Sequence, residues 1–327
     1  MPLLDVSELE ISVHSTGGDI AVVKGVSFQV NKSGTIGIVG ESGCGKSLTS
    51  LAIMGLLDGS QARTTGGTVR FEGTELLGLT MRERRKIMGN QMSMIFQEPM
   101  TSLNPVYRVG DQIAEALRQH RSLTRKAARE RAIELLRMVR IPRPDERIDC
   151  FPHQLSGGQR QRVMVAIAIA CEPKLLIADE PTTALDVTVQ KEILGLLRDL
   201  QEQTGMAVVL ISHDLGVVAE TCDFVAIMYR GKIVETGRAE DVFSSVAHPY
   251  TRGLLNSIPP VDRDVEVLNE IPGRVPSIEQ NVPGCSFHSR CTIAAGICRE
   301  IDPEFSTVSG KHEVRCHFAL GSNNRAV

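Results

Sequence analysis

Short apolar runs alternate with helically periodic segments through most of the chain. Four runs that end in glycine or in polar residues predict buried strands: TIGIVG at 35–40, MSMIF at 92–96, LLIAD at 175–179 and AVVLIS at 207–212. Periodic segments predict helices over 46–57 and 187–203. Strands that alternate with helices favour a mostly parallel sheet covered by helices.

Three other segments near the start read as short strands, at Leu9–Val13, at Gly25–Val30, where polar and apolar side chains alternate, and at 67–73. They predict an antiparallel part of the structure. Residues 110–140 are charged, rich in alanine and helically periodic, which indicates a helical insertion. Its apolar face contains Ala128, Ala132, Leu135 and Val139.

The pattern weakens after about residue 237. Residues 259–283 are rich in Pro, Val, Asp and Glu without a clear period, and they predict a linker that leads into a small tail containing cysteines. The 327 residues suffice for one large α/β domain with an appendage, or for two domains.

Charge and hydropathy narrow the classes of function. The formal net charge of −3 and the pI of about 6.3 disfavour nucleic acid as the main partner. The longest apolar run, 163–171, has nine residues, whereas a membrane span needs about 18. The N-terminus lacks the basic region of a secretion signal, so we expect a cytosolic protein. The eight cysteines are then not expected to form disulfides.

The segment GESGCGKS, Gly40–Ser47, satisfies the phosphate-binding pattern G-x-x-x-x-G-K-[ST]. It follows a predicted buried strand and opens a helix, where backbone N–H groups and the helix dipole favour phosphate. Lys46 is expected to bridge the β- and γ-phosphates, and Ser47 to bind Mg²⁺. The alternative is a chance glycine-rich turn, which the strand–loop–helix context disfavours.

A pair of acids ends the strand of LLIADEP. Ligands of open α/β sheets bind at the carboxyl ends of strands. We expect Asp179 to hold Mg²⁺ and Glu180 to orient and polarise the attacking water. Taken alone, the pair could equally cap a helix; together with the phosphate loop it favours an NTPase.

The segment LSGGQRQR, Leu155–Arg162, narrows the class further, because here the chain resembles the ATP-binding cassette (ABC) family over residues 3–240. Each motif alone is weak, since a lone Gln or His at a strand end is usually structural. The ordered set is specific, and it comprises the loop at 40–47, Gln97, the signature at 155–159, Asp179–Glu180, Ala184–Leu185–Asp186 and His213.

This resemblance implies the fold. It is an α/β P-loop NTPase cassette with a RecA-like, mostly parallel sheet core, an antiparallel β part and a helical subdomain at about 98–170. The cassette is expected to span residues 1–240, and residues 241–327 to form a C-terminal extension that bears the cysteines.

The resemblance also implies the site residues. Lys46, Gln97, Glu180 and His213 are the expected catalytic residues, and Ser47, Gln97 and Asp179 the expected Mg²⁺ ligands. ATP is expected to bind Gly40, Glu41, Ser42, Gly43, Cys44, Gly45, Lys46, Ser47, Leu48, Gln97, Asp179, Glu180 and His213. The residues expected to reach the ATP of a second chain are Leu155, Ser156, Gly157, Gly158, Gln159 and Asp186. Residues 14–25 lack the aromatic that stacks on adenine in many cassettes, so Ile20 or Val22 is expected to pack there.

Partners follow from the same resemblance. In the family, two chains meet head to tail, and each signature covers the other chain's γ-phosphate. We therefore expect a dimer with a second, related ATPase or a second copy, two transmembrane permease subunits facing 98–105 and 110–140, and indirectly a solute-binding protein. No nucleic acid is expected. The chain is expected to be a peripheral subunit at the cytoplasmic face of the cell's inner membrane.

Four cysteines crowd into the tail, namely Cys285, Cys291, Cys298 and Cys316. Four thiols in a cytosolic chain suggest a metal. The close C-x₂₋₄-C pairs of structural zinc are absent. The wider spacing is compatible with a [4Fe–4S] cluster, although it matches no familiar ferredoxin run. Four buried, inert thiols are the alternative.

The tail also narrows the family. HPYTRGLLNSIPP at 248–260, IPG at 271–273 and the cysteine pattern look like the C-terminal extension of the dipeptide/oligopeptide importer ATPases, members of which carry an iron–sulfur cluster. The expected function is the ATP-hydrolysing motor of a peptide importer. The alternatives are an importer of nickel or another small solute, or a soluble ABC ATPase acting on ribosomes or DNA.

Overall fold

The computed structural model describes residues 1–57, 61–183, 185–257 and 270–321. They fall into two units of interleaved sequence. The first unit comprises residues 1–3, 30–34 and 71–211, and the second comprises 4–29, 35–70 and 212–327. No described helix is both long and apolar enough to cross a membrane.

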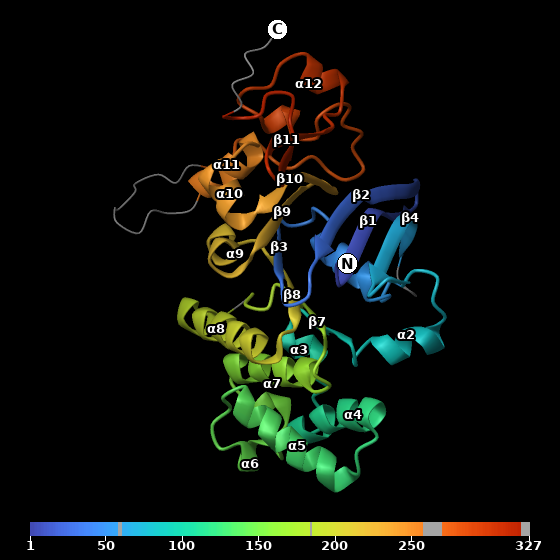
Figure 1. Ribbon diagram of the computed structural model, residues 1–327, viewed down its shortest axis with the longest axis vertical. Coiled ribbons are helices and arrows are strands. Elements are labelled where there is room, and N and C mark those ends of the chain that lie inside the picture. The colour runs from blue at the N-terminus through green and yellow to red at the C-terminus, as the bar shows by residue number, and fades with distance from the viewer. Residues whose placement is uncertain (58–60, 184, 258–269, 322–327) are drawn as a thin grey trace. The chain divides into compact units, whose positions relative to one another are not determined.

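The first unit contains a parallel sheet and most of the helices (Figure 1). Its elements are β5 (Thr74–Glu75), α2 (Met81–Ile87), β6 (Met92–Ile95), α3 (Pro99–Ser102), α4 (Val109–Arg121), α5 (Arg125–Met138), α6 (Pro144–Arg147), α7 (Gly157–Ile169), β7 (Leu175–Asp179), α8 (Val187–Thr204) and β8 (Ala207–Ser212, its last residue in the second unit). The β7 strand lies between β6 and β8 and is parallel to both, in the register Ile95↔Ala178 and Asp179↔Ile211.

Helices α4 to α7 gather at one end of this unit, where the sequence predicts a helical insertion (Figure 1). Thr124 caps α5 by accepting a hydrogen bond from the N–H of Ala127, and Arg125 begins the helix. The predicted apolar face is confirmed, because its four side chains are at most 1% exposed. These four are Ala128, Ala132, Leu135 and Val139.

The second unit holds the phosphate loop and the C-terminal extension. Its elements are β1 (Leu4–Ser15), β2 (Gly18–Val30), β3 (Thr35–Val39), α1 (Lys46–Ile53), β4 (Ala62–Phe71), α9 (Leu215–Thr221), β9 (Phe224–Tyr229), β10 (Lys232–Arg238), α10 (Ala239–Ser244), α11 (Pro249–Asn256), α12 (Ile297–Glu300), β11 (Phe305–Ser309) and β12 (His312–Arg315). Strand β1 lies between β2 and β4. Because only two residues join β1 to β2, the two strands are antiparallel, as predicted.

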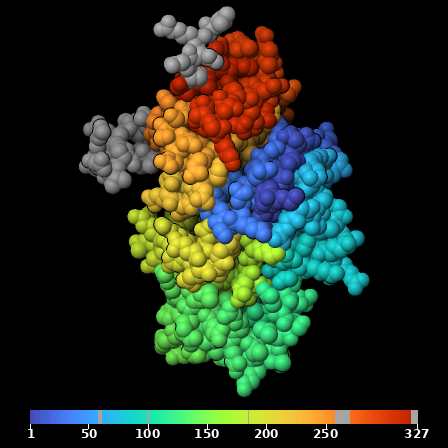
Figure 2. All heavy atoms as spheres, in the orientation of Figure 1, coloured from blue at the N-terminus to red at the C-terminus, as the bar shows by residue number. Residues whose placement is uncertain are grey.

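The extension is part of a sheet in this unit. Strand β3 pairs with β9 in parallel, and β10, β12 and β11 follow in antiparallel order. The tail therefore adds two strands to the sheet rather than hanging from it. Figure 2 shows the C-terminal segment, in red, packed against the orange segment that contains α10 and α11.

The sequence misplaces some boundaries. The helix predicted over 46–57 ends at Ile53, because Met54 is its C-cap and Gly55 has φ +65°, the left-handed conformation that stops helices. The β1 and β4 strands are longer than predicted, since pairing within the sheet extends them. Of the predicted linker 259–283, residues 259–269 lie outside the described residues, and 270–283 form no helix or strand.

Candidate functional site

The phosphate loop of the second unit joins the fully buried strand β3 to helix α1. Gly43 has φ +79° and Gly45 has φ +106°, conformations that glycine adopts without strain. Gly40 is required for a different reason. A Cβ atom there would lie 2.1 Å from the carbonyl oxygen of Met228, so only glycine fits against β9.

Lys46 is the first residue of α1 and is 5% exposed. Its Nζ donates hydrogen bonds to the carbonyl oxygens of Gly40 (2.7 Å) and Glu41 (3.1 Å). Burial raises the pKa of the adjacent Cys44 thiol, which remains protonated near neutral pH. The loop thus carries one buried ammonium group beside the N-terminus of a helix, an arrangement suited to phosphate.

Other predicted nucleotide contacts of this unit are placed as follows. His213 lies directly after β8 and is exposed. Ile20 is half-buried on β2, whereas Val22 is 5% exposed. Of these two, Ile20 has the more accessible side chain for packing against adenine.

In the first unit, two predicted catalytic side chains are in contact. Gln97 follows β6, Glu180 follows β7, and the amide Nε2 donates a 3.1 Å hydrogen bond to the Oε2 of Glu180. The hydroxyl of Thr183 donates to the same oxygen at 2.9 Å. Glu180 has φ +45°, an uncommon conformation for a residue other than glycine. Its N–H donates to the carbonyl of Ile211 at 3.0 Å, which holds this conformation in place.

Asp179 ends β7 and is 4% exposed, so its carboxylate lies inside the unit beside Glu180. Asp186 is exposed and caps α8, where Oδ1 accepts from the N–H of Val189 at 2.9 Å. Asp186 thus has a local structural role, in addition to its predicted contact with the ATP of a second chain. Ala184, which belongs to the same predicted motif as Asp186, lies outside the described residues.

The signature begins α7 with a capping box. The hydroxyl of Ser156 accepts from the N–H of Gln159, and the side chain of Gln159 accepts from the N–H of Ser156. Leu155 is buried, whereas Ser156 and Gly157 are exposed. A Cβ atom at Gly158 would lie 2.8 Å from Val189, so glycine permits close packing of α7 on α8. The exposed end of α7 leaves a hydroxyl and helix N–H groups accessible to an anion.

The segment His248–Tyr250 has a structural role that the sequence did not reveal. His248 is the N-cap of α11, and its Nδ1 accepts from the N–H of Tyr250 at 3.0 Å. Burial lowers the pKa of His248 to about 3, so the ring is neutral and can accept this bond. The fully buried Tyr250 then accepts, through its hydroxyl, a 2.9 Å hydrogen bond from the N–H of Glu41 in the phosphate loop.

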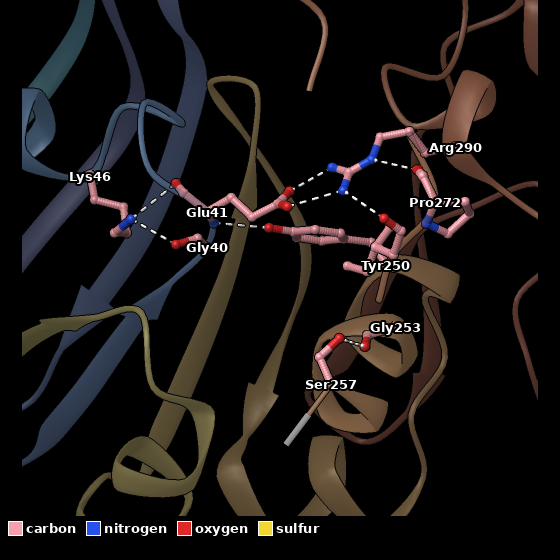
Figure 3. Close-up of polar contacts among 9 residues, drawn as sticks. Gly40, Glu41, Lys46, Tyr250, Gly253, Ser257, Pro272 and Arg290 are labelled. Carbon is pink, nitrogen blue, oxygen red and sulfur yellow. Dashed lines mark hydrogen bonds and ion pairs between the residues drawn. The ribbon is translucent and has the colours of Figure 1, made fainter. Parts of the chain in front are cut away.

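Arg290 is a second residue that was not predicted. It lies one position before Cys291, and its side chain is 4% exposed. Nη1 and Nη2 donate to the two carboxylate oxygens of Glu41 at 2.6 and 3.0 Å (Figure 3). The only available signal was an arginine amid cysteines and apolar residues, which does not identify a partner.

The four tail cysteines line one pocket together with His248 and Phe287. Burial, with the charges of the neighbouring thiolates, raises the pKa of Cys285 to about 11 and that of Cys316 to about 12. Among the described residues, no group of three or more His, Cys, Asp or Glu side chains is arranged to hold a single metal ion. The tail thus brings its four thiols to the lining of one pocket.

Comparisons with known proteins agree with this geometry. Residues 23–183 match the family "ABC transporter", and residues 234–298 match "Oligopeptide/dipeptide transporter, C-terminal region". The probable peptide ABC transporter ATP-binding protein y4tR of Sinorhizobium fredii is 51% identical over 96% of this chain and 94% of its own length. The dipeptide transport ATP-binding protein DppD of Bacillus subtilis is 48% identical over 96% and 94%, respectively.

A solved structure shares the fold. The ATP-binding cassette MJ0796, in a dimeric post-hydrolysis state bound to ADP and Pi, has a TM-score of 0.64 and 28% identity, over 72% of this chain and 98% of its own. The predicted fold class is confirmed. This chain belongs to the ATP-hydrolysing subunits of ABC transporters, within the group that carries the oligopeptide/dipeptide transporter C-terminal region.

Proposed function

We propose that this chain powers the uptake of dipeptides or oligopeptides through a separate membrane permease, by binding and hydrolysing ATP. One observation carries the proposal: a formed phosphate loop and an oligopeptide/dipeptide transporter C-terminal region occur in the same unit of one chain. Similar proteins that match over nearly their whole length are named for peptide transport.

The nucleotide would be held mainly by the phosphate loop. The residues assigned to it are Gly40, Glu41, Ser42, Gly43, Cys44, Gly45, Lys46, Ser47 and Leu48. Backbone N–H groups and the ammonium of Lys46 bind the phosphates. His213 contacts the γ-phosphate, and Ile20 packs against the adenine. The oxygen donors Ser47, Gln97 and Asp179 suit Mg²⁺, which when bound neutralises charge on the phosphates.

Glu180 is assigned as the group that orients and polarises water. Its carboxylate is held by hydrogen bonds from Gln97 and Thr183, which define its orientation. A carboxylate fixed in this way orients a nucleophile without needing to move. The contact with Gln97 supports the assignment of both residues to one site.

The signature would serve a second chain. Ser156 and Gly157 are exposed at the start of the 13-residue helix α7. Each chain carries one phosphate loop and one signature, so a head-to-tail pair completes two sites. Leu155, Gly158, Gln159 and Asp186 support that surface. The second chain is a related ATPase or another copy of this one.

The permease would dock on the first unit. Three apolar side chains after β6 are exposed, with fractions of 40% for Phe96, 73% for Val106 and 56% for Tyr107. We assign residues 1–240 to the cassette and 241–327 to the extension. The chain would work as a peripheral subunit at the cytoplasmic face of the inner membrane, with two permease subunits and, indirectly, a solute-binding protein.

We infer that the tail pocket holds a [4Fe–4S] cluster through Cys285, Cys291, Cys298 and Cys316. What supports this is that the four thiols line one pocket. A cluster uses four thiolates and is larger than one ion. When bound, it would link the segments of the tail and could exchange an electron.

The transport proposal is tested in cells that carry the chain with its permease. The Lys46→Ala variant should abolish uptake of a labelled dipeptide while the protein is still present at the membrane. Loss of nickel uptake with dipeptide uptake intact would favour the alternative importer. Recovery of the chain with ribosomes and without permease would contradict transport altogether.

The cluster proposal is tested on protein purified without oxygen. Visible absorption and assays of iron and sulfide should show about four irons per chain, as a cubane cluster requires. Cys298→Ser should remove the colour, whereas the matched Cys222→Ser, outside the pocket, should not. Stoichiometric zinc without iron would contradict the cluster.

A further inference from the structure

The four tail cysteines lie in the segment Cys285–Cys316, which we call the cysteine segment. A chain of contacts joins it to the phosphate loop within the second unit (Figure 3). Arg290, between Cys285 and Cys291, makes a two-pronged ion pair with Glu41, the second residue of the loop. The two N···O distances, 2.6 and 3.0 Å, are short enough for hydrogen bonds, so the pair is a charge-assisted, bidentate contact. The two residues are 249 positions apart in sequence.

The guanidinium of Arg290 is held on its other sides. Its Nε donates to the carbonyl of Pro272 at 3.1 Å, and its centre lies 5.9 Å from the ring of Tyr229 and 6.0 Å from that of Phe287. Among the described residues, Glu41 is the only carboxylate that pairs with it. The planar guanidinium of Arg290 is therefore fixed in the orientation that pairs with Glu41. Little side-chain conformational entropy remains to be lost when the ion pair forms.

Every polar group of Glu41 makes a hydrogen bond. Its N–H donates to the hydroxyl of Tyr250 at 2.9 Å, and its carboxylate accepts from Arg290. Its carbonyl accepts from Lys46 Nζ at 3.1 Å and from the N–H of Cys44 at 3.3 Å. The residue that the extension holds is thus the one whose carbonyl contacts the phosphate-binding lysine.

We propose that Arg290 is a positioning residue for ATP binding. By fixing Glu41, it holds the loop in the conformation that presents Lys46 and the helix N–H groups to phosphate, so the cysteine segment and the nucleotide site are energetically coupled. This proposal rests on the assignment of the loop as the ATP site. Coupling is reciprocal, so bound ATP stabilises the docked cysteine segment by the same factor.

The test is a double-mutant cycle on the purified full chain, with Arg290→Gln, Glu41→Gln and the double variant. The dissociation constant of a fluorescent ATP analogue is measured by titration. Each single variant should weaken binding by about fivefold or more, in the range of coupling between linked sites. The double variant should be no weaker than the worse single variant, because both remove the same contact. Arg290→Lys should recover part of the affinity.

The matched control is Lys232→Gln. Lys232 on β10 pairs with Asp302 of the extension, so this variant also breaks an ion pair that docks the tail, but it does not touch the loop. Its affinity for the analogue should equal that of the wild type. Urea unfolding without nucleotide reports the stability of every variant.

Three results would overturn the proposal and leave the ATP-site assignment intact. Arg290→Gln could lower stability at unchanged affinity, which makes the pair merely structural. Lys232→Gln could weaken binding as much as Arg290→Gln, which makes the effect general loosening. The effects of the two single variants could multiply in the double variant, which shows no direct link. A Lys46→Ala chain that binds the analogue like wild type would overturn the ATP-site assignment instead, and the proposal with it.

Discussion

The amide of Gln97 and the carboxylate of Glu180 are joined by a 3.1 Å hydrogen bond, although 83 positions separate them in sequence. Parallel pairing of β6 with β7 places the two residues together, because each follows the carboxyl end of its strand. The bond keeps the carboxylate of Glu180 in one orientation. The predicted base is therefore positioned by the sheet rather than by a local motif.

Glu180→Gln should retain ATP binding and lose hydrolysis by about 100-fold or more, the usual contribution of a positioned acid or base. The amide keeps the size of the side chain but cannot polarise water as a carboxylate does. Phosphate release and analogue binding are measured in parallel. The matched control is Glu172→Gln, which also has positive φ (49°) but pairs with Arg131 outside the site. Normal turnover in Glu180→Gln would show that another group is the base.

Ser156→Ala should lower hydrolysis by about tenfold, the equivalent of one hydrogen bond to a charged group. It should also cost about 1 kcal/mol of stability through loss of the α7 cap. Thr80→Ala separates the two effects, because Thr80 makes the same capping box on α2. That control should lose similar stability at unchanged turnover per folded molecule. Equal turnover in both variants would reduce Ser156 to a cap.

Tyr250→Phe should lower the free energy of unfolding by about 1 kcal/mol or more, because the N–H of Glu41 loses its acceptor. Burial, and secondarily the charge of Glu41, raise the pKa of Tyr250, so the protonated hydroxyl is the group removed. Tyr107→Phe is the control. Tyr107 is 56% exposed, so removal of its hydroxyl should cost little. Chemical denaturation compares the two, and equal losses would contradict the role of the Tyr250 bond.

Gly40→Ala should abolish ATP binding and cost about 1–3 kcal/mol of stability, as overpacking of a dense interior does. The added methyl would meet the carbonyl of Met228 at 2.1 Å and push the loop away from β9. Gly195→Ala, on the exposed face of α8, meets no atom within 4 Å. It should raise stability by about 0.5–1 kcal/mol, the helix preference of alanine over glycine. Thermal unfolding with and without ATP measures both, and a stable, ATP-binding Gly40→Ala chain would refute the steric argument.

Local patterns by themselves determined much of this protein. The strand–loop–helix around Lys46, the capped start of α7 at Ser156 and the apolar face of α5 are encoded within a few residues, because turns, caps and helical faces depend on near neighbours. The family and the fold class followed from the order of such motifs. Helix ends were less certain, as the early stop at Met54 shows.

Tertiary structure alone decided the rest. Strands β11 and β12 join the sheet through β10, although the sequence after residue 237 showed only a weak pattern. The contacts of Tyr250 and Arg290 with Glu41 span more than 200 positions, and neither side chain carries a periodic signal. A buried arginine is stable only beside its carboxylate, and folding, not local sequence, selects which carboxylate that is. The local sequence around Lys46 therefore determines the phosphate loop. The contacts of Tyr250 and Arg290 that hold this loop form only in the folded chain.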